Sequence, residues 1–384
     1  MRQIVVPICG GWNAGEAVQA MAKRSSKRSQ SSGAGGVLEA LPALSHLADV
    51  PTFAELEPSG RQRMAFQAAR ARLGGDAELA CVVRLDRGYP AVVTEDALFR
   101  AEFATRLTKG GDSRVAVGDW VCARRPAEHD MGLIEEILPR ESDIARWRGK
   151  ARGEKQTLAA NVDTVIVVQA LLAGEFDPER IVRSAVIARD CGAEVAVVLT
   201  KADRVSLAER EHAVAEIRSL IGDEVAIAVT SSEEGHGIDD VRALVPHGTI
   251  AIVLGESGAG KSTLLNALLG HDALETGAVR ERDDAGRHTT VARRMVSLPG
   301  AGIIVDEPGL RSLPLVGHER GLAKVFPDIA EAATTCKFRD CTHTHEPGCA
   351  VRGGEFAPER VAAYVALASE MRANAATLDP DIVL

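Results

Sequence analysis

The sequence predicts an α/β fold: a domain of alternating strands and helices, with a small all-β domain before it and a small cysteine-containing domain after it. Between residues 164 and 305, apolar runs of strand length alternate with helical segments, and a glycine-rich turn joins one strand to the next helix. Five shorter strand-like runs precede this region, and a group of cysteines and histidines follows it. Nearly all-apolar strands need cover on both faces, so the alternation predicts a parallel sheet between layers of helices.

The composition is typical of a globular protein with two or three domains. The 384 residues are 46% hydrophobic and 26% charged, which allows a sizeable core. The longest apolar runs, such as Val165 to Val168 and Ile250 to Leu254, are far shorter than the roughly 20 residues that span a bilayer. The N-terminus shows no secretion signal. We therefore expect a cytoplasmic protein without a membrane partner.

Charge and cysteine content argue against two other classes of protein. The net charge of -9 argues against a uniformly basic nucleic-acid binder, although it leaves room for local basic patches. The seven cysteines are spread along the chain, with three near the C-terminus. This distribution favours a metal site or free thiols over a disulfide framework.

Residues 1–75 are predicted to be a disordered basic N-terminal extension. Lys23, Arg24, Lys27 and Arg28 occur there without an acidic neighbour, and a serine- and glycine-rich stretch overlaps them. Such a composition cannot bury enough apolar surface to order itself. A solvated tail and an electrostatic tether to RNA both remain open. A single helix is expected within residues 55–73.

Residues 76–145 are predicted to form a five-stranded barrel of the oligonucleotide-binding (OB) type. SH3-like barrels and sandwiches give similar strand spacing and remain open. The aromatic residues Tyr89, Phe99, Phe103 and Trp120 can fill the core of such a barrel or stack on bases. The five strand-like runs are Leu79–Leu85, Ala91–Thr94, Ala97–Ala104, Trp120–Arg124 and Gly132–Leu138.

A linker near Arg148 to Glu154 leads into the α/β region, residues 155–320. The expected strands are Thr164–Ala170, Glu194–Leu199, Val225–Val229, Thr249–Leu254, Ala292–Leu298 and Gly302–Val305. The expected helices are Pro178–Asp190, Leu207–Ile221, Ile238–Leu244 and Lys261–Leu269.

The strongest motif is a phosphate loop at residues 255–262, because it lies between a strand and a helix as such loops require. Its glycines let backbone amides point at a β-phosphate, and Lys261 can neutralise the β and γ oxygens. The residues expected to bind the nucleotide phosphates are Gly255, Glu256, Ser257, Gly258, Ala259, Gly260, Lys261, Ser262 and Thr263.

Oxygen ligands for Mg²⁺ occur at two further places. Asp306 follows the last strand, where a carboxylate can hold Mg²⁺ through water, and Gly309 can offer its amide to the γ-phosphate. Between the phosphate loop and Asp306, a threonine can reach both Mg²⁺ and the γ-phosphate. Thr290 is favoured for this role, and Thr289 is the close competitor. The expected magnesium ligands are Ser262, Thr290 and Asp306.

The base-reading residues precede the phosphate loop. In Thr200-Lys201-Ala202-Asp203, the carboxylate of Asp203 can accept both N1–H and the exocyclic amine of guanine, while the Lys201 stem can lie along the purine face. The Thr230-Ser231-Ser232 turn follows a strand and fits the loop whose backbone amide reads guanine O6, so Ser231 and Ser232 are the expected base-binding residues of this turn. GTP is therefore the expected nucleotide. Ordinary GTPases carry these motifs in the opposite order, so the domain is predicted to be a circularly permuted GTPase.

The group that positions the attacking water is predicted to be unusual. Many GTPases have a glutamine after the glycine of Asp-x-x-Gly, but Leu310 stands at that place here. His288 is the nearest candidate, because imidazole can accept a proton from water near neutral pH. A histidine that contacts only a partner or solvent remains the alternative.

Residues 321–384 are predicted to form a small zinc-binding domain of helices and loops. Cys336, Cys341, His343 and Cys349 give three thiolates and one imidazole, which is the ligand set of a closed structural zinc site. His345 is a competing ligand by proximity. A helix is expected at Pro358 to Ala375.

Together these features resemble the bacterial ribosome small-subunit-dependent GTPase A family over residues 76–384. The motifs that carry the resemblance are Gly118-Asp119-Trp120-Val121, Gln156 to Asp163, the phosphate loop, Gly286 to Thr290, Asp306 to Gly309 and the zinc ligands. The resemblance implies binding to the 30S subunit and its 16S rRNA late in maturation, GTP hydrolysis stimulated by the subunit, and release after hydrolysis. A monomer that docks on a large particle is the simplest expectation.

Two departures from the family pattern have physical consequences. Thr200 stands where most GTPases have an asparagine that bridges guanine N7 and the phosphate loop, so nucleotide affinity is expected to be weaker. Glu307 replaces the more usual serine and adds negative charge near Mg²⁺. Two other classes remain open: a phosphate-loop ATPase or small-molecule kinase, and a noncatalytic RNA-binding scaffold that holds GTP.

Overall fold

The computed structural model describes residues 44, 48–86, 89–105, 107, 115–127, 129–148, 154–172, 176–272, 293–306 and 315–376. Its helices and strands all belong to the second of two compact units into which the chain divides, residues 48–384.

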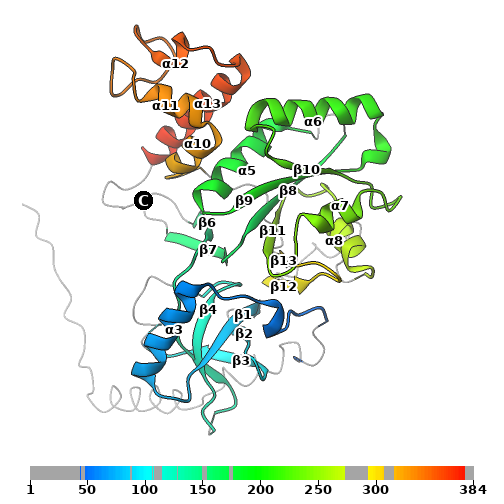
Figure 1. The fold of residues 1–384 in the computed structure, drawn as a ribbon, viewed down its shortest axis with the longest axis vertical. Coiled ribbons are helices and arrows are strands. Elements are labelled where there is room, and N and C mark those ends of the chain that lie inside the picture. Colours follow the sequence, from blue (N-terminus) through cyan, green and yellow to red (C-terminus); the bar gives the residue numbers. More distant parts are fainter. Residues whose placement is uncertain are drawn as a thin grey trace, which may run out of the picture. The chain divides into compact units, whose positions relative to one another are not determined.

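Five strands form a closed barrel of the OB type, which confirms the prediction for this region (Figure 1). The strand order is β1-β2-β3-β5-β4, and β4 pairs again with β1 to close the barrel. Each strand contributes apolar side chains to the interior, among them Val82, Val92, Ala101, Val121 and Ile134. The strands are β1 (Glu78–Asp86), β2 (Tyr89–Val93), β3 (Leu98–Phe103), β4 (Trp120–Arg124) and β5 (Gly132–Ile137).

The barrel aromatics differ in burial, and Phe99 and Phe103 pack against the apolar cluster of the barrel interior. Trp120 is buried and packs edge-on against Phe53, with ring centroids 5.6 Å apart, so it is a core residue. Tyr89, Phe99 and Phe103 are half-buried. The guanidinium of Arg125 lies over the Phe99 ring, 5.4 Å from its centroid.

The α/β domain is built on the strand order β10-β9-β8-β11-β13-β12. The strands β8, β9, β10, β11 and β13 run parallel to one another. The strands are β8 (Thr164–Ala170), β9 (Glu194–Thr200), β10 (Ala226–Val229), β11 (Ile250–Leu254), β12 (Arg293–Ser297) and β13 (Ile303–Asp306). The helices are α5 (Pro178–Asp190), α6 (Leu207–Ile221), α7 (Ile238–Ala243) and α8 (Lys261–Leu269).

Alternate residues of β8 show how the two faces of this sheet are covered. Val165 and Val167 pack in one core cluster with the buried side chains of α5 and α6. Ile166 and Val168 pack in a second cluster with those of α7 and α8. The nearly continuous apolar run of β8 is therefore explained by burial on both faces.

The prediction of an all-parallel sheet is wrong at β12. This strand runs antiparallel to β13, and Arg294 pairs directly with Asp306. The connection from Leu298 to Gly302 is a short turn, and a turn of this length can join only antiparallel neighbours. On its other edge β12 pairs with β1, so the barrel and the α/β domain share one sheet of 11 strands.

The predicted linker near Arg148 to Glu154 lies between two strands that pair with each other. The strands β6 (Asp143–Arg148) and β7 (Glu154–Ala160) pair antiparallel in a separate two-stranded sheet. Ile144 and Leu158 are fully buried and anchor this hairpin. The many charged residues in this stretch of sequence hid the strand pattern.

The prediction of a disordered extension up to residue 75 is wrong for residues 48–75. They contain the short 3₁₀ helix η2 (Phe53–Glu55) and the helix α3 (Gly60–Leu73), separated at Pro58 rather than joined in one helix. Proline favours the start of a helix and stops a preceding one. Ser59 caps α3, and Gln62 is buried and donates to Asn161 Oδ1 at 2.8 Å. Residues 1–43 and 45–47 lie outside the described part of the chain.

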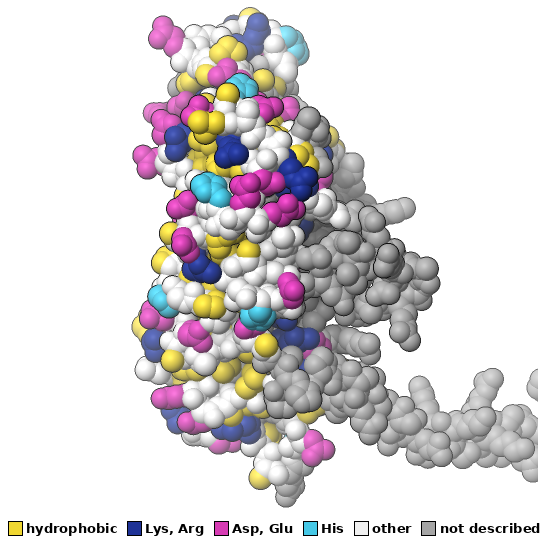
Figure 2. Space-filling view, turned by 90° about the vertical axis from the view of Figure 1, so that its right-hand side faces the viewer, with side chains coloured by type: hydrophobic (Ala, Val, Ile, Leu, Met, Phe, Trp, Pro, Cys, Tyr) yellow, Lys and Arg dark blue, Asp and Glu magenta, His cyan; other side chains and the backbone are white. Residues whose placement is uncertain are grey.

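The described part of the C-terminal region, residues 315–376, contains the helices α10 (Glu319–Val325), α11 (Pro327–Ala333), α12 (Ala350–Gly353) and α13 (Pro358–Ala375). Only α13 was predicted, with the same limits. The buried residues Phe326 and Met371 belong to the same core cluster as Val182 and Val186 of α5. None of the described helices is long and apolar enough to cross a membrane. On the face drawn in Figure 2, acidic and basic side chains are interspersed.

Candidate functional site

The loops predicted to bind the nucleotide follow the carboxyl ends of β9, β10, β11 and β13. Because these strands are parallel, their carboxyl ends lie at one edge of the sheet, which is where ligands bind in open α/β sheets. Direct hydrogen bonds link the loops. The amide of Ala202 donates to Thr230 O at 3.2 Å, and the Thr200 hydroxyl donates to Ala259 O at 2.7 Å.

The backbone of the phosphate loop depends on glycine at two places. A Cβ at Gly255 would lie 2.5 Å from Val168 O, and Gly260 has a φ of +87°, in the left-handed region. Gly260 directly precedes α8, so the loop leads into the N-terminus of that helix. Amides at a helix N-terminus favour bound phosphate.

Lys261 already points back over the phosphate loop. Its Nζ donates to Gly255 O at 2.5 Å and to Glu256 O at 2.6 Å. Glu256, Ser257, Gly258 and Thr263 are exposed at the surface of the loop, Gly260 and Ser262 are half-buried, and Ala259 is buried. The Lys261 ammonium is therefore held above the loop whose amides can receive a phosphate.

Thr200, at the position where most GTPases have asparagine, contacts the phosphate loop. Its hydroxyl is buried and lies within hydrogen-bond distance of Ala259 O (2.7 Å) and Gln169 O (3.3 Å). The strand that carries the base-reading residues is thus still tied to the phosphate loop. The threonine hydroxyl is too short to reach a bound base as well. This is the physical difference between threonine and asparagine at this position.

Asp203 sits in a polar cluster of the two base-reading loops. Hydrogen bonds from the Ser231 hydroxyl and the Arg204 guanidinium hold the pKa of Asp203 below its usual value, so its carboxylate is charged at neutral pH. Arg204 Nε lies 2.8 Å from Asp203 Oδ2. Lys201, beside it, has a φ of +58°.

In the Thr230-Ser231-Ser232 loop, the amides of Thr230 and Ser231 already donate to backbone carbonyls, that of Thr230 to Leu199 O at 2.8 Å. The Ser231 amide donates to His236 O at 3.0 Å, and Ser231 is buried. Ser232 is half-buried, which makes its amide the better candidate of the two for reading guanine O6.

Asp306 stands at the end of β13 beside a cation that the sequence reasoning missed. Arg294 Nε lies 3.7 Å from Asp306 Oδ2, and both side chains are about one-fifth exposed. The pair forms because β12 is antiparallel to β13 and brings these two residues opposite each other. The signal that could have indicated it is the short connection between the two predicted strands, because a connection of this length requires antiparallel neighbours.

A second missed contact involves α5. Arg180 Nη1 lies 2.6 Å from Glu256 Oε2 of the phosphate loop, and Arg180 Nε lies 2.9 Å from Asp177 Oδ2. Four predicted residues, His288, Thr289, Thr290 and Gly309, lie outside the described residues, as does Glu307.

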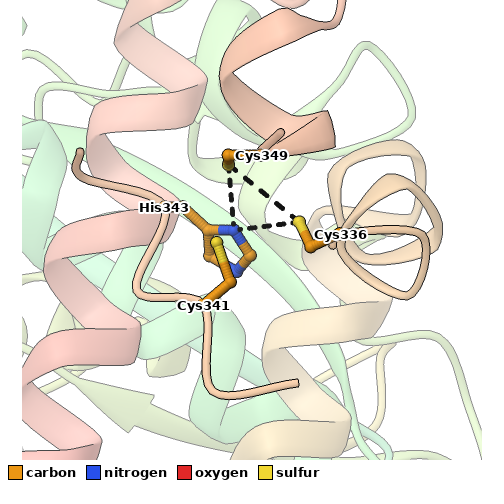
Figure 3. A group of neighbouring side chains, drawn as sticks. All are labelled: Cys336, Cys341, His343 and Cys349. Atoms are coloured by element: carbon orange, nitrogen blue, oxygen red, sulfur yellow. Dashed lines mark hydrogen bonds between the residues drawn. The ribbon is translucent and has the colours of Figure 1, made fainter. Parts of the chain in front are cut away.

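The four predicted zinc ligands converge (Figure 3). His343 Nδ1 lies 3.6 Å from Cys336 Sγ and 3.5 Å from Cys349 Sγ, and these two sulfurs are 4.0 Å apart. All four ligand atoms, including that of Cys341, lie within 4.8 Å of one another. A tetrahedral zinc ion with Cys and His ligands separates them by about 3.5 to 3.8 Å. The cluster therefore fits zinc.

The alternative ligand His345 is not part of this cluster. It is exposed, and its Nδ1 lies 2.9 Å from the Thr344 hydroxyl. Glu346 braces the loop between the ligands by accepting from the amides of Thr342, Thr344 and His345. A hydrogen bond from the Thr342 hydroxyl, together with these amides, holds the pKa of Glu346 well below its usual range.

Comparison with known proteins agrees with these features. Residues 137–316 match the family model of the RsgA GTPase. The "Small ribosomal subunit biogenesis GTPase RsgA" of Streptomyces avermitilis is 41% identical over 302 residues, which cover 78% of this chain and 80% of the relative. The protein of the same name from Xanthomonas euvesicatoria pv. vesicatoria is 38% identical over 298 residues, with 76% and 80% covered.

Solved structures give the same fold. The crystal structure of YjeQ from Thermotoga maritima matches with a TM-score of 0.57 and 25% identity, covering 77% of this chain and 99% of the other. The structure of YloQ, a circularly permuted GTPase, matches with a TM-score of 0.54 and 21% identity, covering 77% and 96%. The chain belongs to the family of small ribosomal subunit biogenesis GTPases RsgA.

Proposed function

We propose that this GTPase binds the 30S ribosomal subunit late in its maturation, hydrolyses GTP to GDP and phosphate when the subunit stimulates it, and leaves after hydrolysis. The observation that carries the proposal is the convergence of the phosphate loop with Asp203 at one edge of the sheet, tied together by the Thr200–Ala259 hydrogen bond. Phosphate binding and guanine recognition need both parts within the length of one nucleotide.

The described residues divide the binding of GTP between them. Asp203 accepts from N1–H and the exocyclic amine of guanine, and the stem of Lys201 covers the purine face. The amide of Ser232 reads O6. The amides of residues 255–263 hold the α- and β-phosphates, and Lys261 turns from the loop carbonyls to the β- and γ-phosphate oxygens.

Mg²⁺ is assigned to the oxygen ligands Ser262, Thr290 and Asp306, where it neutralises charge on the β- and γ-phosphates. The donor set suits it, since magnesium prefers hydroxyl and carboxylate oxygens. Asp306 is only partly exposed and keeps Arg294 as a nearby cation. We assign His288 to orient the attacking water, Thr289 and Thr290 to the γ-phosphate side, and the amide of Gly309 to the γ-phosphate itself.

One structural zinc ion is assigned to Cys336, Cys341, His343 and Cys349. With four protein ligands the site is closed, so it stabilises the loop and leaves no position for a substrate. The proposed partners are the 30S subunit and its 16S rRNA, with the OB-type barrel as a contact surface for RNA. A cytoplasmic monomer is the simplest form that can dock on such a particle.

The decisive experiment measures phosphate release from GTP with purified 30S subunits, with 50S subunits, and with neither. The purified protein must first be shown to bind GDP and to contain zinc. Lys261→Ala is the inactive control, because it removes the ammonium that the β- and γ-phosphates need. We expect 30S subunits to stimulate phosphate release and 50S subunits to leave its rate unchanged.

A flat rate with 30S subunits, from protein that binds GDP, overturns the proposal and favours a noncatalytic scaffold. Competition by ATP as strong as that by GTP favours a phosphate-loop ATPase or kinase instead.

A further inference from the structure

The helix α5 contacts the phosphate loop at its first turn and the C-terminal zinc-binding region at its later turns. Arg180 lies in the first turn, and Arg183 and Asp190 follow it three and ten residues later. These spacings keep the three side chains on one side of the helix. At 1.5 Å per residue, Arg180 and Asp190 are about 15 Å apart along its axis.

At the first turn, Glu256 connects α5 with the lysine that binds phosphate. Its side chain forms the ion pair with Arg180 Nη1 at 2.6 Å, and its carbonyl oxygen accepts from Lys261 Nζ at 2.6 Å. The backbone of Glu256 therefore contacts the Lys261 ammonium, and its side chain contacts α5, so a movement of the ammonium changes the contacts of the residue that pairs with this helix. A second carboxylate, that of Asp177 at the N-cap, holds Arg180 Nε in place.

At its later turns, α5 binds α10 and α13. Asp190 accepts from the Gly321 amide at 2.9 Å and lies 3.1 Å from His318 Nδ1, while Arg183 forms a two-fold ion pair with Glu370 of α13. The packing against α10 is close, because a Cβ at Gly321 would lie 2.0 Å from Val186 O. Closely packed helices of this kind transmit small shifts rather than absorb them.

We propose that Arg180 is a positioning residue of the phosphate loop and that α5, through the Arg180–Glu256 ion pair, passes nucleotide binding on to the zinc-binding region. This inference rests on the proposed function. A bound phosphate competes with the Glu256 carbonyl for the Lys261 ammonium. When Lys261 leaves the Glu256 carbonyl, the backbone of Glu256 shifts and its carboxylate moves with it. This movement displaces Arg180 and the first turn of α5. Because the helix is rigid, Arg183 and Asp190 shift as well.

The experiment compares hydrogen exchange of residues 315–333 and 358–376 with and without GDP and a nonhydrolysable GTP analogue. It uses the wild-type protein, Arg180→Ala, Arg180→Lys and Arg189→Ala. Arg189 is the matched control, since it lies on the same helix but its side chain pairs with Glu194, away from the phosphate loop. GDP affinity and zinc content are measured on the same samples. Arg180 is about half exposed, so its replacement should leave the fold intact.

We expect nucleotide to change exchange in both segments of the wild type and of Arg189→Ala, but not of Arg180→Ala. Arg180→Lys should restore part of the response, because the ammonium keeps the charge without the fork of donors. GDP affinity should fall by about fivefold at most in Arg180→Ala, as is usual for a half-exposed ion pair. A full response in Arg180→Ala, or none in the wild type, overturns the inference. Absent GDP binding by the wild type would instead refute the proposed function.

Discussion

The Thr200 hydroxyl donates a hydrogen bond of 2.7 Å to the Ala259 carbonyl, and this bond ties the base-reading strand to the phosphate loop. Both residues are buried. In this chain the bond is what remains of a longer bridge that asparagine makes in most GTPases. The same loop carries Lys261, the lysine proposed to bind phosphate, two residues later, so we expect the Thr200 contact from β9 to help position this lysine.

Replacing Thr200 by valine should weaken GDP binding by about tenfold, the equivalent of one hydrogen bond of roughly 1.4 kcal/mol. Valine has nearly the same shape but leaves the Ala259 carbonyl buried without this donor. Titration with a fluorescent GDP analogue measures the change, and Thr200→Ser is the control that keeps the hydroxyl. Thr200→Asn should raise affinity above that of the wild type. Equal affinities for valine and threonine would contradict this role.

Replacing Asp203 by asparagine should shift the preference from guanine toward xanthine nucleotides. The carboxylate accepts two hydrogen bonds from guanine, whereas an amide offers a donor that complements the additional oxygen of xanthine. The depressed pKa of Asp203 means that the wild-type carboxylate stays ionised well below neutral pH, so guanine preference should not decline between pH 8 and pH 6. Competition of GDP and XDP for both variants measures the shift, and unchanged preference means that another residue reads the base.

Helices and strands buried on both faces were the most predictable elements of the fold. The predicted limits of α5, α6, α8, α13 and β8 agree with the structure. The helices α5 and α6 have a side-chain N-cap, α8 lies between two glycines, α13 begins at a proline, and β8 contains a continuous apolar run. The phosphate loop and the four zinc ligands could be predicted because the spacing of their residues is shared by few other kinds of site.

The errors lie where tertiary contacts overrode local pattern. Arg294 faces Asp306 only because β12 runs antiparallel to β13. The short connection between the two predicted strands is the signal for this direction, but the prediction followed the alternation of strands and helices in the rest of the domain. Gln62 is polar and lies in a weakly amphipathic helix, so its burial follows from its partners and not from its own chemistry. Arg180 reaches Glu256 over 76 residues of chain, and no motif relates the two positions.

Replacing Gln62 by alanine should lower the free energy of unfolding by about 1 to 3 kcal/mol. The side chain donates to Pro139 O at 3.1 Å and to Asn161 Oδ1 at 2.8 Å, and both acceptors would lose a buried partner. Urea unfolding measures the loss. Gln67→Ala is the matched control, because Gln67 is exposed on the same helix α3 and makes the same change in helix propensity. Equal stabilities of the two variants would show that α3 does not contribute through Gln62.

Removing the metal should unfold the C-terminal region before the rest of the chain. Four converging ligands leave charged or polar groups buried together, so this region depends on the ion for its stability. Cys341→Ser should lose zinc and lower the melting temperature, whereas His345→Ala should retain one zinc ion per chain. Metal analysis of both purified variants distinguishes them. Loss of zinc from His345→Ala with retention in Cys341→Ser would reverse the assignment of the ligands.

Replacing His288 by alanine should lower the 30S-stimulated rate of GTP hydrolysis by about 10² to 10⁴, the usual range for loss of a general base or water-orienting group. GTP affinity should change little, since the histidine is assigned to the attacking water and not to the phosphates. Single-turnover phosphate release with saturating 30S subunits measures the rate, and His212→Ala, on the exposed side of α6, is the control. Hydrolysis by His288→Ala at the wild-type rate would assign the water to another group.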